Sequence, residues 1–298
     1  MKRSLVTGGA GFIGSHLVDK LLSLGHDVVV IDNESSEGHD EYYWNNNTQN
    51  HKYDIRNFTD IAPLFQGVDY VFHLAAKASV QASVDNPLPT ISTQVMGTAN
   101  VLEAARLSGV EKFVYSSTSA CYGNRNPIPN VETMREDPLN AYAIGKLSGE
   151  QMVKAYYGLY GMKTIAFRYT NVYGERARHV GTYAPAVSKF LKMRREGEPL
   201  TIFGDGDQRR DFIHVSDVVD ANALVSFMEP DNWGEVYNIG FGKNWSIQEI
   251  ADAISSDQVH LSGRPGEMRE TLADIRKAHA ELNWKPKVDI IEWIGRQQ

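Results

Sequence analysis

Short apolar runs alternate with longer amphipathic stretches along the first half of the chain. The runs are rich in β-branched residues, which is typical of strands, and the stretches between them repeat apolar positions at helical spacing. The expected strands are residues 4–7, 28–32, 70–74, 113–117 and 164–168, and the expected helices include residues 13–24, 98–107 and 142–160. Continuous apolar strands separated by helices form a parallel sheet that is covered on both faces. The pattern therefore predicts a doubly wound α/β fold.

The pattern changes after about residue 170, where the elements become shorter and the loops longer. Glycine and proline are scattered through this part, as in residues 204–207 and 263–266. A chain of 298 residues is long enough for two unequal domains. We expect residues 1–170 to form the α/β domain and residues 171–298 to form a smaller region, either separate from the first or interleaved with it. The polar residues 45–50 are expected to form a loop.

Composition narrows the classes of function. Charged residues make up 22% of the chain and hydrophobic residues 42%, as in ordinary globular proteins. The formal net charge of -7 repels the phosphate backbone of nucleic acids. No apolar run approaches the roughly 18 residues of a membrane span, and no signal-peptide segment precedes the first strand. One cysteine, Cys121, excludes an internal disulfide, so we expect a cytoplasmic protein that binds neither nucleic acid nor membranes.

The segment TGGAGFIG at residues 7–14 directly follows the first expected strand and opens the first expected helix. Gly9, Gly11 and Gly14 have the spacing of a dinucleotide-binding loop in its required context. Glycine permits the tight turn and lets a pyrophosphate approach the backbone, while the helix N-terminus supplies free N–H groups and a positive dipole end. The alternative is a cluster of turn glycines without a ligand.

Asp32 ends the second expected strand, where a carboxylate binds the ribose diol of the cofactor and repels a 2′-phosphate. Asn33 follows it, and no arginine is near in the sequence. These residues favour NAD over NADP. The alternative for Asp32 is a helix-cap or turn aspartate.

Tyr142 and Lys146 are four residues apart, so both side chains lie on one face of the expected helix. A cationic amine beside a phenol favours the phenolate and lowers the pKa of the tyrosine, which then acts as general base and acid. The alternative is a surface pair without chemistry. The hydroxyl residues 116–119 follow a strand end, and one of them is expected to hydrogen-bond the reacting oxygen; their alternative is a helix or turn cap.

Together these motifs resemble the extended short-chain dehydrogenase/reductase family, and within it the NDP-sugar epimerases and dehydratases. The resemblance extends from Ser4 to about Trp284. Beyond the residues above, it is carried by residues 54–55, 73–76, 168–174 and 210–215. It implies that residues 1–170 are an NAD-binding Rossmann domain and that residues 171–298 mainly bind the nucleotide sugar.

The resemblance also implies the roles of individual residues. Tyr142 is the proton shuttle, Thr118 is its hydroxyl partner, and Lys146 also holds the nicotinamide ribose; no metal is expected. The implied cofactor residues are Gly8, Gly11, Phe12, Ile13, Gly14, Asp32, Asn33, Asp54, Ile55, Leu74, Ala75, Ala76, Tyr142, Lys146 and Tyr169. The implied substrate residues are Thr118, Tyr142, Asn171, Thr182, Phe203, Arg210, Arg264 and Thr271. The alternatives are a core position for Phe203, a structural ion pair for Arg210 and a solvated side chain for Arg264.

Within this family the sequence favours a 4-epimerase that acts on a UDP-hexose. The related 4,6-dehydratases place an acidic pair after the strand hydroxyl, whereas Ser119 and Ala120 stand here. The related 3,5-epimerases use a cysteine in this region, but Cys121 falls one position later and is expected to be a small buried residue. Another reaction of the family, such as uronic-acid 4-epimerisation, reduction or dehydration, remains open, as does a noncatalytic NAD-binding sensor.

Two expectations follow from the resemblance alone. Thr271 occupies the position that gates the sugar pocket, and its small size implies that UDP-N-acetylhexosamines are accepted as well as UDP-glucose and UDP-galactose. A homodimer is implied, with residues 89–107 and 142–160 of each subunit at the interface.

Overall fold

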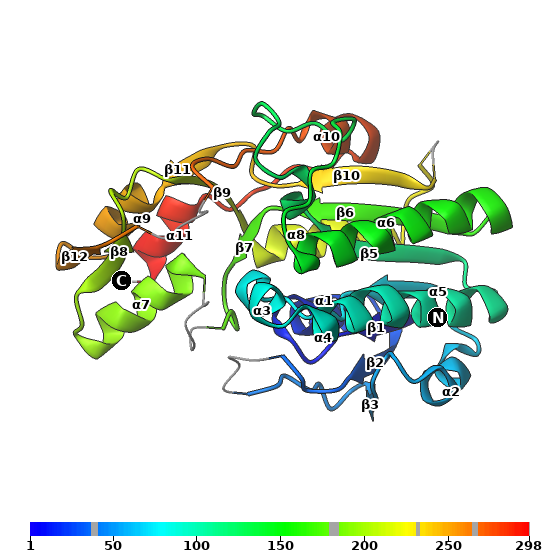
Figure 1. Cartoon of the computed structure of the whole chain (residues 1–298). Helices are drawn as coiled ribbons and strands as arrows, with labels where there is room; N and C mark the ends of the chain where they lie inside the picture. Colours follow the sequence, from blue (N-terminus) through cyan, green and yellow to red (C-terminus); the bar gives the residue numbers. More distant parts are fainter. Residues whose placement is uncertain (37–40, 179–184, 231–232, 264–267, 298) are drawn as a thin grey trace.

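The computed structural model describes residues 1–36, 41–178, 185–230, 233–263 and 268–297. Its centre is a seven-stranded sheet in the order β10-β6-β5-β4-β1-β2-β3, in which all neighbours pair in parallel (Figure 1). The strands are β1 (Arg3–Thr7), β2 (Asp27–Asp32), β3 (Gln49–Lys52), β4 (Tyr70–His73), β5 (Lys112–Thr118), β6 (Lys163–Tyr169) and β10 (Glu235–Ile239). The predicted doubly wound fold is confirmed.

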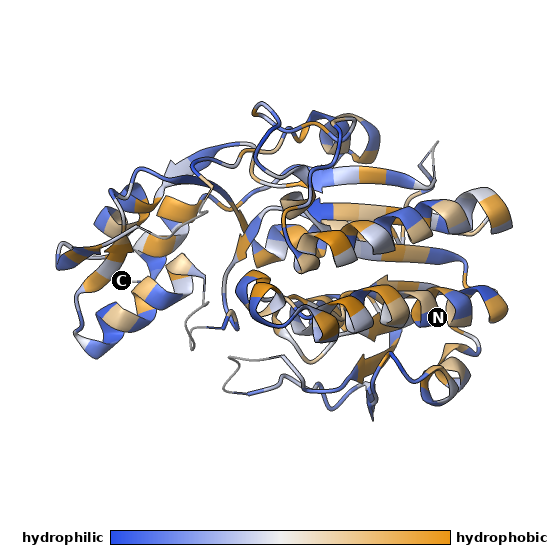
Figure 2. Ribbon diagram, viewed as in Figure 1, coloured by the Kyte–Doolittle hydropathy of each residue, from blue (hydrophilic) through white to orange (hydrophobic). Residues whose placement is uncertain are grey.

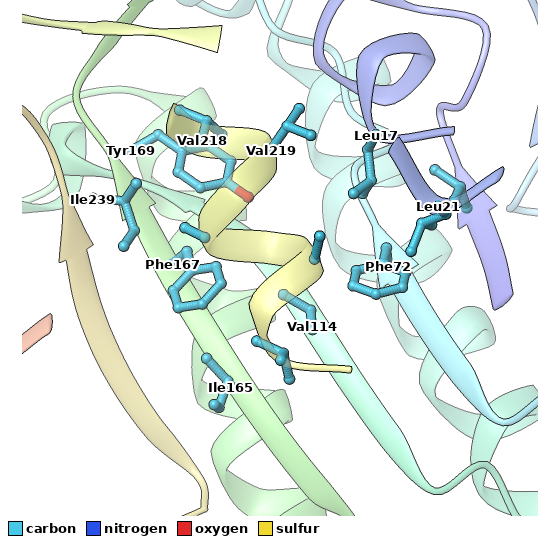
Figure 3. Packing of buried hydrophobic residues seen from close by; sticks show 14 of the residues in the cluster. Leu17, Leu21, Phe72, Val114, Ile165, Phe167, Tyr169, Val218, Val219 and Ile239 are labelled. Carbon is cyan, nitrogen blue, oxygen red and sulfur yellow. The ribbon is translucent and has the colours of Figure 1, made fainter. Parts of the chain in front are cut away.

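Alternating strand residues supply two separate cores, one on each face of the sheet. Val28 and Val30 of β2 pack into the first core with helices α1 (Phe12–Ser23) and α8 (Val215–Leu224). Figure 3 shows part of this core, including Leu17 of α1 and Val218 of α8. Val29 and Ile31 pack into the second core, beneath α5 (Thr98–Leu107) and α6 (Ala141–Tyr160). Along α5 and α6 the apolar residues recur between hydrophilic ones (Figure 2), as expected for helices with one buried face.

The smaller sheets begin where β6 ends, because β7 (Asn171–Tyr173) follows Tyr169 almost at once. β7 and β11 (Asn244–Ser246) flank β9 (Arg209–His214), and β8 (Leu200–Phe203) pairs with β12 (Gln258–Leu261). A third core joins them to α7 (Ala186–Glu196), α9 (Ile247–Ile254) and α11 (Ile290–Arg296), to the left of the large sheet in Figure 1. The chain nevertheless returns to the large sheet in β10, α8 and α10 (Arg276–Leu282).

Short helical turns complete the described chain. They are α2 (Phe58–Ile61), α3 (Val80–Asp85), α4 (Pro87–Ile91), the 3-10 turns η1 (Ala62–Phe65) and η3 (Ser119–Tyr122), and the π-helical turn η2 (Ser92–Gly97). Within the described ranges, no helix is long and apolar enough to cross a membrane.

The expectation that residues 45–50 form a loop was wrong in part. Gln49 and Asn50 begin the edge strand β3 instead of ending a loop. Most side chains of β3 are exposed, so the strand carries no apolar pattern, and its pairing with β2 comes from backbone hydrogen bonds.

The junction between β1 and α1 depends on close backbone packing. Gly8 has a φ of 71°, a conformation that favours glycine. A Cβ on Gly14 would lie 2.0 Å from the carbonyl oxygen of Gly8, so only glycine lets the helix approach the loop this closely.

We expect Gly14→Ala to lower the free energy of unfolding by about 1–3 kcal/mol, because the added methyl group displaces the loop backbone. Gly158→Ala is the matched control, since a Cβ on this α6 glycine meets nothing within 4 Å. That change should raise stability by about 0.5–1 kcal/mol. Urea unfolding measures both, and equal effects of the two changes would contradict the packing argument.

Candidate active site

A cavity of about 320 Å³ lies where the strands of the large sheet end. In doubly wound sheets, ligands bind beyond the carboxyl ends of the strands, and this volume suits a small molecule. Among its described lining residues are Gly8, Gly11, Phe12, Ile13, Gly14, Asp32, Asn33, Ile55, Leu74, Ala75, Ala76, Ser116, Ser117, Tyr142, Lys146 and Tyr169. Most of the cofactor residues expected from the sequence therefore share one cavity.

The glycine loop presents bare backbone to this cavity. Gly11 caps α1, so the first N–H groups of the helix face the place where a pyrophosphate would bind. A Cβ on Gly8 would lie 2.8 Å from the backbone nitrogen of Ala75, which shows how closely the two loops meet. Gly9 lies in the loop, and a Cβ added to it would lie 2.7 Å from Val30 Cγ1 of the first core. Among the described residues, the glycines that line the cavity are Gly8, Gly11 and Gly14.

Asp32 lies at the end of β2 and faces the cavity. Its carboxylate accepts the N–H groups of Ala10 at 3.1 Å and Glu34 at 2.8 Å, and burial raises its pKa. Asp32 can therefore stabilise the turn and still bind a ligand, since a carboxylate has several acceptor sites. This geometry fits a ribose diol.

Asp54 does not line the cavity but supports its wall. Its carboxylate accepts the side-chain amide of Asn33 at 3.0 Å and Nε of Arg56 at 2.9 Å. The guanidinium of Arg56 holds the pKa of Asp54 at about 2. The fold thus brings an arginine near the adenosine end that the sequence did not reveal, with Nε and Nη2 both bonded to Asp54.

The hydroxyl groups after β5 have different partners. Ser116 Oγ lies 3.1 Å from the hydroxyl of Tyr169, and Ser117 Oγ donates to Glu150 at 2.8 Å. Thr118 Oγ1 accepts the N–H of Ala120 at 3.1 Å, as a cap, and its hydroxyl lies near enough to the phenol of Tyr142 to lower the pKa of that group. Of these three hydroxyls, Thr118 is the one that affects the tyrosine.

Tyr142 and Lys146 lie near the start of α6, whose N-terminus is capped by the side chain of Asn140. The amine of Lys146 donates to the carbonyl oxygen of Ser116 at 2.6 Å, and burial lowers its pKa to about 8. Burial raises the pKa of Tyr142, while the nearby hydroxyl of Thr118 lowers it.

The expectation that Lys146 lowers the pKa of Tyr142 is not met, because its amine points to a carbonyl group and desolvation dominates the phenol. The cation that lowers the pKa of Tyr142 is Arg178, which also lines the cavity. Arg178 comes from the loop after β7, and no local motif marks it.

A second cavity of about 230 Å³ contains Asn171, Phe203 and Arg210, three of the expected substrate residues. Val172 and Pro185 line both cavities, so the two lie side by side. The side-chain amide of Asn171 donates to the carbonyl of Asp211 at 2.9 Å. One guanidinium nitrogen of Arg210 donates to the carbonyl of Arg209 at 2.9 Å. This arrangement fits an anionic ligand that extends from the first cavity.

Thr271 lies beside β9, where its hydroxyl accepts the N–H of Asp211 at 3.3 Å. It is not among the described residues that line the two cavities. Thr182 and Arg264 lie outside the described residues. Cys121 is buried, and burial raises the pKa of its thiol to about 12, so the expectation of a small buried residue is confirmed.

The sequence missed several residues of the first cavity because long-range packing brings them there. They include Ser35, Ser36, Tyr42, Tyr53, Thr93 and Arg178. Thr93 belongs to the π-helical turn η2, a type of distortion often found at functional sites. Nothing in the local sequence predicts that turn.

Comparison with known proteins gives a consistent result. A sequence model described as the NAD dependent epimerase/dehydratase family matches residues 4–240. The chain is 39% identical to a putative UDP-glucose 4-epimerase of Methanocaldococcus jannaschii, covering 98% of this chain and 96% of the relative.

Two solved structures are similar over almost their whole length. The UDP-glucose 4-epimerase of Thermotoga maritima with UDP-glucose has a TM-score of 0.92 at 38% identity, covering 98% of this chain and 96% of that one. The UDP-N-acetylglucosamine 4-epimerase of Methanobrevibacter ruminantium, in complex with UDP-N-acetylmuramic acid, has a TM-score of 0.90 at 34% identity, covering 100% and 99%. The chain is therefore an enzyme that belongs to the NAD-dependent epimerase/dehydratase family, with NAD as its cofactor.

Proposed function

We propose that the protein is a UDP-hexose 4-epimerase that interconverts UDP-glucose and UDP-galactose through a transient 4-keto sugar. The observation that carries the proposal is the position of the Thr118–Tyr142 pair beside a cofactor cavity that lies next to a second cavity with Arg210. The 4-epimerases among its relatives support it.

The residues present fit NAD. Gly8, Gly11 and Gly14 line the cavity without side chains at the N-terminus of α1, so a pyrophosphate can approach the backbone there. Asp32 would hold the adenosine ribose, and Lys146 the nicotinamide ribose. Bound NAD supplies the oxidation of the sugar C4 alcohol and the later reduction of the ketone.

In this proposal Tyr142 takes the proton of the sugar O4 hydroxyl during oxidation and returns it during reduction. Thr118 orients the phenol and the reacting oxygen. Arg210 binds the pyrophosphate of the substrate, so that the nucleotide stays in the second cavity while the sugar presents either face. No carboxylate follows Thr118, since Ser119 and Ala120 occupy those positions, and this favours epimerisation over loss of water.

A cytoplasmic location is also proposed, supported by the buried free thiol of Cys121. It is consistent with the net charge of -7, which favours solubility.

We expect Tyr142→Phe to lower kcat by about 10²–10⁴-fold with NAD still bound, because it removes the general base. Tyr157→Phe, an exposed tyrosine on the same helix, is the control. Because burial raises the pKa of Tyr142 above its ordinary value of about 10, the phenolate fraction grows with pH across the neutral and mildly alkaline range, and kcat should rise with it.

Incubation with UDP-, GDP- and dTDP-sugars, including UDP-glucuronate, identifies the products by NMR. Release of NADH or a stable keto product would contradict epimerisation. Full cellular function of Tyr142→Phe would favour a noncatalytic sensor.

We further propose that N-acetylated UDP-hexoses are substrates, because Thr271 is small and lies next to the strand that carries Arg210. Thr271→Tyr should then lower kcat/KM for UDP-N-acetylglucosamine at least about tenfold while UDP-glucose changes little, since a pocket excludes the larger group by steric conflict. Thr271→Val removes the hydroxyl without adding bulk and is the control. Equal losses for both substrates would refute the gate.

We also propose a homodimer, supported by an apolar surface on α4, η2 and α6. Leu88 is 75% exposed, Met96 58% and Ile144 45%, and these three elements pack together. Exposed apolar patches of this kind mark interfaces. The double change Leu88→Glu and Met96→Glu should convert dimer to monomer, because it places charges in the interface.

Light scattering coupled to size-exclusion chromatography measures the molar mass of the wild type and of the double variant in solution. Phe227→Glu is the control, because this residue is 64% exposed and follows α8, on the opposite face of the sheet. A wild-type monomer, or a dimer unaffected by the double change, would count against the interface.

A further inference from the structure

A buried ion pair lies directly behind the hydroxyl residues of the site. Arg168 on β6 donates through Nε to Glu150 Oε2 at 3.0 Å and through Nη2 to Oε1 at 2.5 Å. Both side chains are only 1% exposed. Arg168 also donates to Glu136 at 3.0 Å and lies over the ring of Tyr122. Burying two charges is costly unless further hydrogen bonds satisfy them, so this arrangement calls for a role.

Glu150 connects this pair to the cofactor cavity. Ser117 stands opposite Arg168 in the register of β5 and β6, and its hydroxyl donates to the same Oε2 atom that receives Arg168. A serine hydroxyl has a single proton, and here Glu150 accepts it. Since Ser117 also lines the first cavity, its oxygen can act there only as an acceptor.

The same carboxylate is tied to the catalytic helix. Glu150 comes four residues after Lys146 and eight after Tyr142, so all three lie along one side of α6. Glu136, by contrast, shares Arg168 with Glu150 but makes no hydrogen bond to Ser117. Glu150 therefore bonds both Arg168 and Ser117, whereas Glu136 bonds Arg168 but not Ser117.

We propose that Glu150, held by Arg168, is a positioning residue that fixes Ser117 as a hydrogen-bond acceptor for an O–H or N–H donor of bound NAD. The ion pair supplies the rigidity and Ser117 makes the contact. The inference concerns the cofactor, and only its kinetic readout rests on the proposed epimerase activity.

Glu150→Gln tests the inference with almost no change of shape. The neutral amide has only one oxygen to accept from Ser117 and Arg168, and its NH₂ group faces a donor at the other position, so the hold on the Ser117 proton is weakened. We expect the dissociation constant of NAD to rise about tenfold and kcat to fall by about 10–100-fold, the usual range for supporting residues. Ser117→Ala should weaken NAD binding similarly. The double variant should bind NAD no more weakly than the single variant with the lower NAD affinity, because both changes act on one hydrogen bond.

Glu136→Gln is the matched control, because it removes the charge of another partner of Arg168 without touching Ser117. It should leave the NAD dissociation constant within about twofold of the wild type. Calorimetric titration of the full chain with NAD, with urea unfolding alongside, separates positioning from loss of stability.

A purely structural Glu150 would lower the stability, give losses that add to those of Ser117→Ala, and leave NAD affinity at the level of Glu136→Gln. That result would overturn the inference, as would unchanged NAD affinity in Ser117→Ala alone, even if Glu150→Gln does not fold. Failure of the wild type to epimerise any sugar would overturn the proposed function and leave the NAD titration as the test.

Discussion

The parallel pairing of β5 and β6 is the constraint on which the rest of the site depends. Their register runs from Lys112 opposite Lys163 to Thr118 opposite Tyr169, so both strands end at the same level. The chain between two parallel neighbours must cross over the sheet, and here α6 makes that crossing. A helix placed this way begins above the strand ends, which brings Tyr142 to the hydroxyl group of Thr118.

The substrate side depends on a different buried group, Asp211 of β9. Its carboxylate accepts backbone N–H groups of Phe241 at 2.8 Å, Gly242 at 3.3 Å and Ala273 at 3.1 Å. Burial raises its pKa to about 6, so the charge costs energy that these donors offset. The bonds join β9 to the loop after β10 and to the segment that carries Thr271. Arg210, the neighbour of Asp211, is thereby held at the second cavity.

The sequence predicted those parts of the fold and site that local physics determines. The strands and helices of the first half have clear periodicity, and the glycine loop, Asp32 and the Tyr142–Lys146 pair have short-range spacing. The edge strand β3 could not be predicted, because its polar side chains carry no pattern. The partner of Lys146 and the place of Arg178 in the cavity also escaped prediction, since each depends on residues distant in the sequence.

The hydrogen bonds of the site also bear on the choice of reaction. Among the described residues that line the first cavity, the one carboxylate is Asp32, at the end of β2. Glu136 and Glu150, the carboxylates near the hydroxyl residues, are both bonded to Arg168. A dehydratase needs a free acid beside the sugar to expel water, whereas an epimerase needs only a proton shuttle and its hydroxyl partner. With Glu150 bonded to Arg168 and Ser117, the described residues offer no free carboxylate beside Thr118 and Tyr142, and this favours the proposed epimerisation over dehydration.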